Sequence, residues 1–410
     1  MDKIEELLTR AVANIIPSRE ELEKKLRSGK KIRVYQGFDP TSPQFHIGHL
    51  VGLRKLRQWQ DLGHEVIFLI GDFTGMIGDP TGKDTARIPL TQEQTRKNAK
   101  TYKEQASKIL KFDGENPVKI KYNSEWFAKM SAAQLIELTS YLTIQQVVER
   151  DMFQKRMKNN MNIAMSEFLY PFMQGYDSVA MDVDVEIGGS DQLFNMMTGR
   201  DLMHKIKRKN KFVMTTPLLT DVAGNKIGKT EGNAIAITDE PGDLFGKIMT
   251  LPDDAIVKGL EYLTDIPINE IKKIEQKIKK GENPIQYKKL LAFEIVKQLN
   301  NEQSAKKAQE HFERVVQQRE LIPVFEMQNI PTWPRPRTLI SGPTIVEPLV
   351  KTNTVQSKSE VKRLVEQGGI AIITKGGEER QIADIDTPLP NEEVVIRVGK
   401  RKFVKIKSAS

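Results

Sequence analysis

The chain of 410 residues contains no cysteine and only five histidines. The lack of cysteine excludes disulfides, thiolate zinc sites and a cysteine nucleophile. Five scattered histidines give little material for a metal site, so any catalytic metal is expected to be bound by oxygen. No segment has the pattern of a signal peptide or the length of a membrane span. We therefore expect a cytoplasmic protein with no membrane partner.

Positive charge is present in modest excess. The chain has 63 lysines and arginines against 54 aspartates and glutamates, which gives a net charge of +9 and a pI near 9.3. This balance favours a polyanionic partner without requiring one, because many soluble basic proteins bind no nucleic acid. With 39% hydrophobic residues over this length, the chain can bury a full core. We expect two or three domains.

The opening part of the chain alternates strand and helix patterns. Ile32 to Gln36 is predicted to form a strand, His49 to Trp59 a helix, and the apolar run Val66 to Ile70 a strand buried on both faces. Helices around Ala132 to Arg150 and a strand near Val183 to Ile187 are predicted to continue the alternation. This order predicts an α/β fold with a Rossmann-like, doubly wound parallel sheet.

The rest of the chain has a different organisation. Residues 244–320 show helical periodicity, and the proline-rich stretch Ile330 to Arg337 is expected to act as a spacer, because proline cannot continue a helix. Beyond it, Ser357 to Gln367 is predicted to form a helix, and Ile370 to Thr374 and Val394 to Val398 are predicted strands. The predicted parts are a catalytic domain at 1–238, an all-helical domain at 239–328, a linker at 329–344 and a small α+β domain at 345–410.

Residues 37–50, between the first predicted strand and helix, combine several chemical features. His46 and His49 are three apart at the start of the helix, so both rings can face one side, where backbone N–H groups and the helix dipole favour phosphate. Gly48 between them permits close approach of a nucleotide. An isolated histidine pair would more often cap and pack a helix end. The preceding strand and the Pro40-Thr41 loop favour a nucleotide site instead.

The segment Phe45 to Leu50 resembles the HIGH signature of class I aminoacyl-tRNA synthetases, and its tetrapeptide is complete. That family pairs HIGH with a mobile lysine loop, KMSKS, and Lys226-Ile227-Gly228-Lys229-Thr230 stands at the expected later position. Only the two lysines agree outright, although glycine at the third place is a familiar variant among tyrosine enzymes. The resemblance implies a loop that closes on the ATP phosphates. Taken alone, such a loop is more often solvated surface.

Three further segments, around Tyr35, Asp79 and the stretch from Tyr170 to Asp177, resemble bacterial-type tyrosyl-tRNA synthetases specifically. By that resemblance Tyr35 and Asp177 hydrogen-bond the phenol of L-tyrosine, while Asp79, Tyr170 and Gln174 hold its ammonium group. Tyr170, Gln174 and Asp177 fall on one stripe of a helix, and a stripe that mixes phenol, amide and carboxylate is a poor core surface. Without the other motifs, the same stripe would equally be interpreted as a polar helix face exposed to solvent.

The same resemblance supplies the other candidate residues. The segment Glu186 to Gln192 has the strand, glycine turn and acidic residue that suit adenosine binding, and Gln192 would lie near the tyrosine carboxylate. Lys83 and Arg87 match a second cationic arm that reaches toward pyrophosphate, with a flexible basic loop as the alternative. The predicted ATP-binding residues are Gly37, Asp39, His46, Gly48, His49, Gly189, Asp191 and Lys229. The residues predicted to act in catalysis are Thr41, His46, His49, Lys83, Arg87, Lys226, Lys229 and Thr230.

The final module resembles the αL RNA-binding motif that is appended to bacterial tyrosine enzymes. The resemblance covers Gln356 to Gly369 and continues at Arg397 to Phe403. Basic side chains of both segments can form a compact surface for RNA phosphates, with a solvated charge run as the alternative. The predicted RNA-binding residues are Lys358, Lys362, Arg363, Lys400, Arg401 and Lys402.

The resemblance as a whole implies a ligase that activates L-tyrosine with ATP and then loads tyrosine onto the terminal adenosine of tRNA(Tyr). Attack of the tyrosine carboxylate on the α-phosphate needs no nucleophilic side chain, and Mg²⁺ is expected on the ATP phosphates rather than on protein ligands. Relatives act as homodimers. The enzyme alternatives are a tryptophan-specific synthetase and a small-molecule nucleotidylyltransferase. The other alternative is a synthetase-derived RNA-binding protein without aminoacylation activity, which the intact histidines and lysines of both signatures disfavour.

Overall fold

The computed structural model describes residues 2–81, 89–141, 143–221, 224, 226–227, 234–314, 331–334, 344–375, 378–399 and 402–407. The chain forms two compact units, residues 1–309 and 310–410, each with its own sheet. Within the described ranges, no helix combines the length and the hydrophobicity that crossing a membrane requires.

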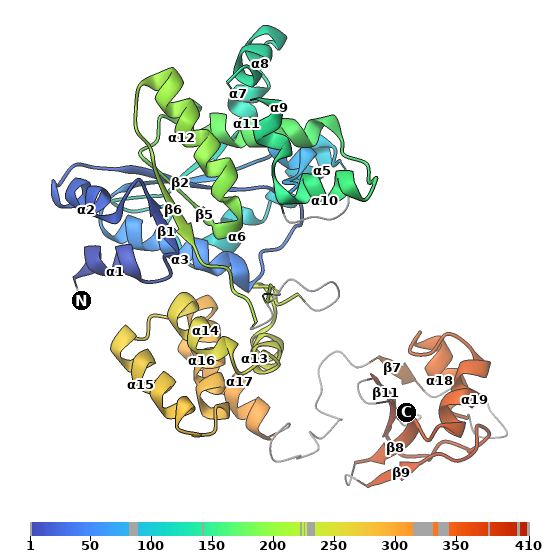
Figure 1. Cartoon of the computed structure of the whole chain (residues 1–410). Coiled ribbons are helices and arrows are strands. Elements are labelled where there is room, and N and C mark those ends of the chain that lie inside the picture. Colours follow the sequence, from blue (N-terminus) through green and yellow to red (C-terminus); the bar gives the residue numbers. More distant parts are fainter. Residues whose placement is uncertain are drawn as a thin grey trace. The chain divides into compact units, whose positions relative to one another are not determined.

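The first unit is built on a six-stranded sheet with the strand order β1-β6-β5-β2-β3-β4 (Figure 1). The strands are β1 (Asn14–Ile16), β2 (Arg33–Phe38), β3 (Glu65–Ile70), β4 (Lys119–Tyr122), β5 (Val185–Gly189) and β6 (Phe212–Thr216). All neighbours pair in parallel except β1, which is antiparallel to β6. The prediction of a doubly wound parallel sheet is therefore confirmed, because the order reverses direction between β2 and β5.

Helices cover both faces of this sheet, with α3 on one side and α11 and α12 on the other (Figure 1). The helix predicted after the first strand is α3 (Ile47–Asp61), which ends before Gly63, a glycine with φ of +83°. The predicted stripe lies on α11 (Met165–Met181), which packs along α12 (Leu193–Lys207). The other helices are α1 (Lys3–Thr9), α2 (Arg19–Arg27), α4 (Thr74–Ile77), α5 (Gln92–Ala99), α6 (Tyr102–Ala106), α7 (Ser124–Phe127), α10 (Asp151–Lys158) and the 3₁₀ helix η1 (Ser190–Gln192).

The helices expected around Ala132 to Arg150 are confirmed. The segment forms two short helices, α8 (Ala132–Thr139) and α9 (Ile144–Val148). Thr143 explains the second start, because its hydroxyl accepts a hydrogen bond from the Gln146 backbone N–H while the Gln146 side chain accepts one from the Thr143 N–H. This reciprocal capping box begins a new helix inside the apparent periodicity.

The helical periodicity predicted beyond residue 244 is confirmed as far as the structure describes it. Helices α13 and α14 pack against α16, and α14 also contacts α3 beneath the first sheet. These helices are α13 (Pro241–Met249), α14 (Ala255–Leu263), α15 (Ile268–Lys279), α16 (Ile285–Leu299) and α17 (Glu302–Phe312). The contact between α14 and α3 joins this helical part to the helix that is capped by His46.

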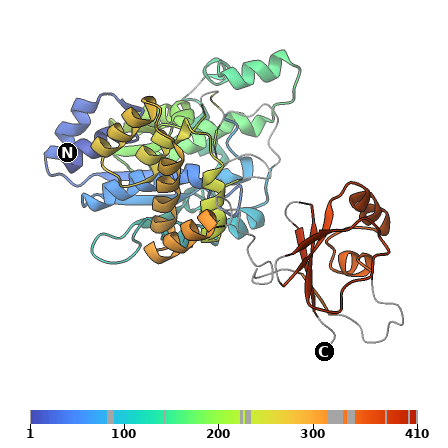
Figure 2. The same cartoon turned by 90° about the horizontal axis from the view of Figure 1, so that it is seen from below.

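The second unit is a small α+β fold whose five-stranded sheet has the order β7-β11-β10-β8-β9. Figure 2 shows its helices packed beside the sheet. Its elements are β7 (Thr332–Pro334), α18 (Val346–Lys351), α19 (Lys358–Glu366), β8 (Ile370–Thr374), β9 (Glu379–Gln381), β10 (Val394–Val398) and β11 (Lys402–Lys407). Apolar side chains of both helices and of the sheet share one core, which includes Leu349, Val361 and Ile396.

The predicted helix and two strands of this second unit are confirmed. Part of the stretch expected as a spacer is instead the edge strand β7, which pairs in parallel with β11 and buries Trp333 in the core. Proline is compatible with this position, because an edge strand leaves one side of its backbone unpaired. Residues 335–343 of the expected linker lie outside the described residues.

Candidate active site

A pocket of about 370 Å³ opens at the carboxyl ends of strands β2 and β5, where the strand order reverses. Such a switch point is the usual ligand site of a doubly wound sheet. Every candidate for tyrosine, ATP or catalysis that the structure describes lines this one pocket. These residues are Tyr35, Gly37, Asp39, Thr41, His46, Gly48, His49, Asp79, Tyr170, Gln174, Asp177, Gly189, Asp191, Gln192 and Lys226. The candidates Lys83, Arg87, Lys229 and Thr230 lie outside the described residues.

The two histidines of the HIGH-like segment have fixed orientations. Nδ1 of His46 accepts a hydrogen bond from the Gly48 backbone N–H at 3.1 Å, and Nδ1 of His49 accepts one from the His46 N–H at 3.1 Å. In a neutral imidazole, a nitrogen that accepts leaves the proton on the other nitrogen. Both rings therefore carry their proton on Nε2, and both line the pocket with their centroids 3.9 Å apart.

Gly48 is required by this arrangement. A Cβ atom at that position would lie 2.9 Å from Cε1 of His46, closer than carbon atoms approach in folded proteins. The glycine thus allows the His46 ring to fold back over the first turn of α3. The sequence argument for Gly48 rested on the approach of a nucleotide, and the structure adds this contact within the chain.

Asp39 is held between two donors at the centre of the pocket. The Tyr170 hydroxyl donates to its Oδ2 at 2.8 Å, and the Thr74 hydroxyl donates to its Oδ1 at 2.7 Å. Burial raises the pKa of Tyr170 well above its usual value, and the neighbouring Asp39 carboxylate adds to that effect. Tyr170 therefore stays a neutral phenol whose proton is directed at Asp39, which leaves its oxygen able to accept from a ligand.

The carboxylate of Asp79, which lines the pocket, accepts two side-chain hydrogen bonds. Its Oδ2 accepts from Nε2 of Gln192 at 2.6 Å, and its Oδ1 accepts from the Thr81 hydroxyl at 2.7 Å. Nearby, Nζ of Lys226 forms an ion pair with Asp191 at 2.6 Å. The lysine predicted to meet phosphate thus has a carboxylate neighbour from the predicted nucleoside site.

Asp177 lines the part of the pocket assigned to the phenol of tyrosine and is only 3% exposed. Its carboxylate accepts hydrogen bonds from Nε1 of Trp126 at 2.9 Å and from Nδ2 of Asn123 at 3.4 Å. Burial raises the pKa of Asp177 well above its usual value, and the Asp39 and Glu186 carboxylates add to it, while the two hydrogen bonds oppose the shift. Trp126 and Asn123 were missed by sequence reasoning, because strand β4, which places them at this sheet edge, was not predicted.

A second group missed by the sequence lies behind Tyr35 and Gln174. Ser178, Glu186 and Lys211 are each at most 2% exposed and bond to one another. Glu186 belongs to the predicted nucleotide segment, but it points to the tyrosine end of the pocket. Lys211 lies just before strand β6 and carried no motif, so no sequence signal identified it.

The predicted RNA-binding residues belong to the second unit. Lys358, Lys362 and Arg363 are exposed on α19, and Lys402, exposed at the start of β11, donates a hydrogen bond to the Thr354 carbonyl at 3.0 Å. Because Thr354 precedes α19 by a few residues, the fold brings Lys402 toward that helix. The candidates Lys400 and Arg401 lie outside the described residues.

Comparison with known proteins gives consistent matches. The model of the family tRNA synthetases class I (W and Y) matches residues 27–317. The tyrosine–tRNA ligases of Thermotoga maritima and Carboxydothermus hydrogenoformans are 44% and 42% identical to the chain, each over 98% of it and over 96% and 97% of their own lengths. A C-terminally truncated mitochondrial tyrosyl-tRNA synthetase from Coccidioides posadasii is similar in structure, with a TM-score of 0.61 and 26% identity over 76% of this chain and 92% of its own.

Proposed function

The chain belongs to the class I tRNA synthetases of the tryptophan and tyrosine group, and from that premise we infer that it is a tyrosine–tRNA ligase. It activates L-tyrosine with ATP and transfers the tyrosyl group to tRNA. One observation carries the choice of tyrosine: the HIGH histidines and the buried carboxylate of Asp177 line the same pocket. An RNA-binding protein without aminoacylation activity would have no use for this arrangement.

Recognition of tyrosine is proposed to rest on two sets of side chains. Tyr35 and Asp177 would hydrogen-bond the phenol, while Asp79, Tyr170 and Gln174 would hold the ammonium group. The amide oxygen of Gln174 is buried and has no hydrogen-bond partner in the part of the chain that the structure describes. A buried acceptor of this kind is costly unless a ligand supplies the donor, and the ammonium group of tyrosine is such a donor.

Adenylate formation is proposed to depend on positioning and electrostatics. The tyrosine carboxylate attacks the α-phosphate in line, and pyrophosphate leaves. The Nε2–H groups of His46 and His49 can donate to phosphate oxygens, and Lys226 adds positive charge beside them. Thr41, Lys83, Arg87, Lys229 and Thr230 are proposed to complete this group, with Gly37, Gly189 and Gln192 lining the cleft. Mg²⁺ bound to the ATP phosphates would arrive with that substrate.

The proposed function is tested by ATP–pyrophosphate exchange with purified protein. Exchange is expected with tyrosine and not with phenylalanine or tryptophan, and the charging of tRNA is expected to require the same amino acid. Exchange that depends on tryptophan would favour the other specificity of this family. Product formation that is independent of tRNA and of any amino acid would instead support a small-molecule nucleotidylyltransferase.

The second unit is proposed to bind the tRNA through exposed cations on α19 and at the start of β11. Replacing Lys362 and Arg363 together by glutamate is expected to lower kcat/KM for tRNA by about tenfold or more, because phosphate contacts are lost. Tyrosine-dependent exchange should stay unchanged, since the pocket lies in the other unit. The control is Lys24→Glu, which changes an exposed lysine on α2. Equal effects of both variants on charging would remove this assignment.

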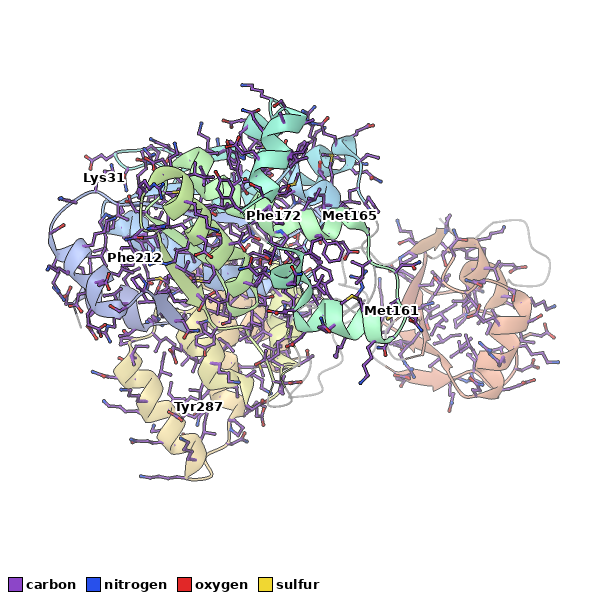
Figure 3. The ribbon with its side chains drawn as sticks, turned by 45° about the horizontal axis from the view of Figure 1, so that its top comes forward. Lys31, Met161, Met165, Phe172, Phe212 and Tyr287 are labelled. Atoms are coloured by element: carbon purple, nitrogen blue, oxygen red, sulfur yellow. The ribbon has the colours of Figure 1, made fainter. Side chains whose placement is uncertain are left out.

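A homodimer is proposed on the basis of exposed apolar side chains between α8 and α11. Ile144 on α9 and Met165 at the start of α11 are 75% and 73% exposed, and Met161, which precedes α11, is 37% exposed; both methionines are labelled in Figure 3. Exposed apolar side chains of this size are suited to burial against a second copy of the chain. Ile144→Asp is expected to convert a dimer into a monomer in sedimentation velocity, whereas Ile285→Asp, a change at a half-exposed isoleucine on α16, should have no effect. A monomeric wild-type protein would contradict the proposal.

A further inference from the structure

A buried ion pair lies directly behind the tyrosine end of the pocket. Nζ of Lys211 contacts Oε2 of Glu186 and also donates to the Ser178 hydroxyl oxygen at 2.8 Å. Lys211 is fully buried and Glu186 is 2% exposed, but Glu186 also lines the pocket. Removing two charges from water is costly, so a pair at this place needs a reason other than stability alone.

Two glycines leave room for this ion pair beside helices α11 and α12. Helices α11 and α12 approach closely at Gly175 and Gly199. A Cβ atom at Gly199 would lie 2.6 Å from Nζ of Lys211 and 3.0 Å from Oγ of Ser178. No side chain larger than hydrogen fits there without displacing the cluster. The pair therefore packs against the point where α11 and α12 approach each other.

The donors and acceptors of this cluster determine how Gln174 is oriented. The carboxylate of Glu186, which pairs with the ammonium group of Lys211, presents acceptor oxygens to its neighbours. Oε1 of Glu186 lies 3.3 Å from Nε2 of Gln174, so the amide must present its NH₂ group to Glu186. The other end of the amide, Oε1 of Gln174, is then left without a partner among the described residues.

The cluster reaches Tyr35 as well. Its hydroxyl lies 2.9 Å from Oγ of Ser178, and that oxygen also accepts from Lys211. Burial raises the pKa of Tyr35 well above its usual value, and the Glu186 and Asp177 carboxylates add to it, so Tyr35 stays a neutral phenol. A single buried ion pair thus touches both sets of side chains assigned to tyrosine recognition.

We propose that Glu186 and Lys211 are positioning residues for tyrosine recognition, which turn the amide oxygen of Gln174 toward the ammonium group of the substrate. The inference rests on the proposed function, because it concerns the substrate of that same pocket. An amide with the opposite orientation would direct its NH₂ group at the ammonium ion and repel it. The pair therefore makes the pocket selective for an amino acid over an aromatic compound without a charged nitrogen.

Glu186→Gln tests the proposal, because glutamine keeps the shape but loses the charge that fixes the amide. The measurement is inhibition of tyrosine-dependent pyrophosphate exchange by tyramine and by 4-ethylphenol, which differ by the ammonium group. In the wild type, tyramine is expected to bind much more tightly than 4-ethylphenol. In the variant that preference is expected to fall by about tenfold or more, the size of one hydrogen bond to a charged group. KM for ATP should change by less than about twofold.

Two further variants separate positioning from structural damage. Glu186→Gln combined with Lys211→Met leaves no unpaired buried charge and is expected to lose the ammonium preference in the same way. Glu167→Gln breaks another buried ion pair of α11, with Arg156, in which both side chains are 1% exposed. That control is expected to lower the melting temperature and to keep the preference for tyramine.

The outcomes distinguish this inference from the function on which it rests. A wild-type protein that exchanges pyrophosphate only with another amino acid overturns the proposed function, and the inference falls with it. If the wild type uses tyrosine and both Glu186 variants keep the tyramine preference within about twofold, the inference alone is wrong. An equal loss of preference in Glu167→Gln would also overturn it, because general destabilisation would then explain the effect.

Discussion

Replacing Asp177 by alanine is expected to raise KM for tyrosine about 100-fold and to abolish most of the selectivity against phenylalanine. A site built to hydrogen-bond a hydroxyl rejects the analogue that lacks it, and tyrosine enzymes of this family are known to reject phenylalanine by roughly 10⁵. The carboxylate of Asp177 is a buried acceptor at the end of the pocket. Without it, the phenol of tyrosine meets no charged partner there, and phenylalanine loses its disadvantage.

The variant also removes the acceptor of the partly buried Nε1 of Trp126 and one of the two acceptors of Nδ2 of Asn123, which keeps its hydrogen bond to Thr74. An unpaired buried group costs about 1–3 kcal/mol of stability. Selectivity is therefore measured as the ratio of kcat/KM for tyrosine and phenylalanine in pyrophosphate exchange, because a loss of folded protein cancels in that ratio. Asp201→Ala, a change at an exposed carboxylate on α12, is the control. An Asp177→Ala protein that still rejects phenylalanine would show that the phenol is recognised elsewhere.

The second large effect is expected from His46→Asn, which should slow adenylate formation by about 10²–10³-fold. This is the size reported when one preorganised donor to a developing negative charge is removed. Asparagine is chosen because it caps helices well, so the hydrogen bond to the Gly48 backbone can be kept while the Nε2–H group is lost. KM for tyrosine is expected to change little, since His46 is assigned to the phosphates and not to the amino acid.

Single-turnover formation of tyrosyl-adenylate is the measurement for this variant. His46→Ala serves as the comparison, because it removes both the donor and the cap and is expected to lose about 1 kcal/mol of stability in addition. If His46→Asn forms adenylate at the wild-type rate while His46→Ala does not, then His46 acts only as the helix cap. That result would support the alternative interpretation, in which the histidine pair only caps and packs the helix end.

Helix α3 shows how far a local pattern can be followed. Its start at the HIGH-like segment was predicted from the sequence, because caps act within a few residues, and the structure places its end just before Gly63, a glycine with positive φ. The capping role of His46 and the nucleotide role were treated as alternatives in the sequence. The structure shows that the capping bond and exposure to the pocket are compatible, since one ring nitrogen serves each.

The residues that hold the pocket side chains in place could not be predicted from the sequence in the same way. Trp126 and Asn123 act on Asp177 across about 50 positions of sequence, and Lys211 acts on Glu186 from the next strand. None of these residues stands in a pattern with its partner. Asn123 and Trp126 follow the carboxyl end of β4, whereas Lys211 precedes the amino end of β6, so only the assembled sheet with its helices brings these residues to their partners.

The sequence by itself determined the parallel sheet, the helical part, the small final unit and the identity of most residues that line the pocket. These features follow from periodicity and from motifs whose members are close in the chain. The tertiary structure alone decided which side chains hold those residues in place, such as the Glu186–Lys211 pair behind Gln174. The reason is physical: burial and hydrogen-bond partners of a side chain are set by elements distant in sequence, and no local pattern records them.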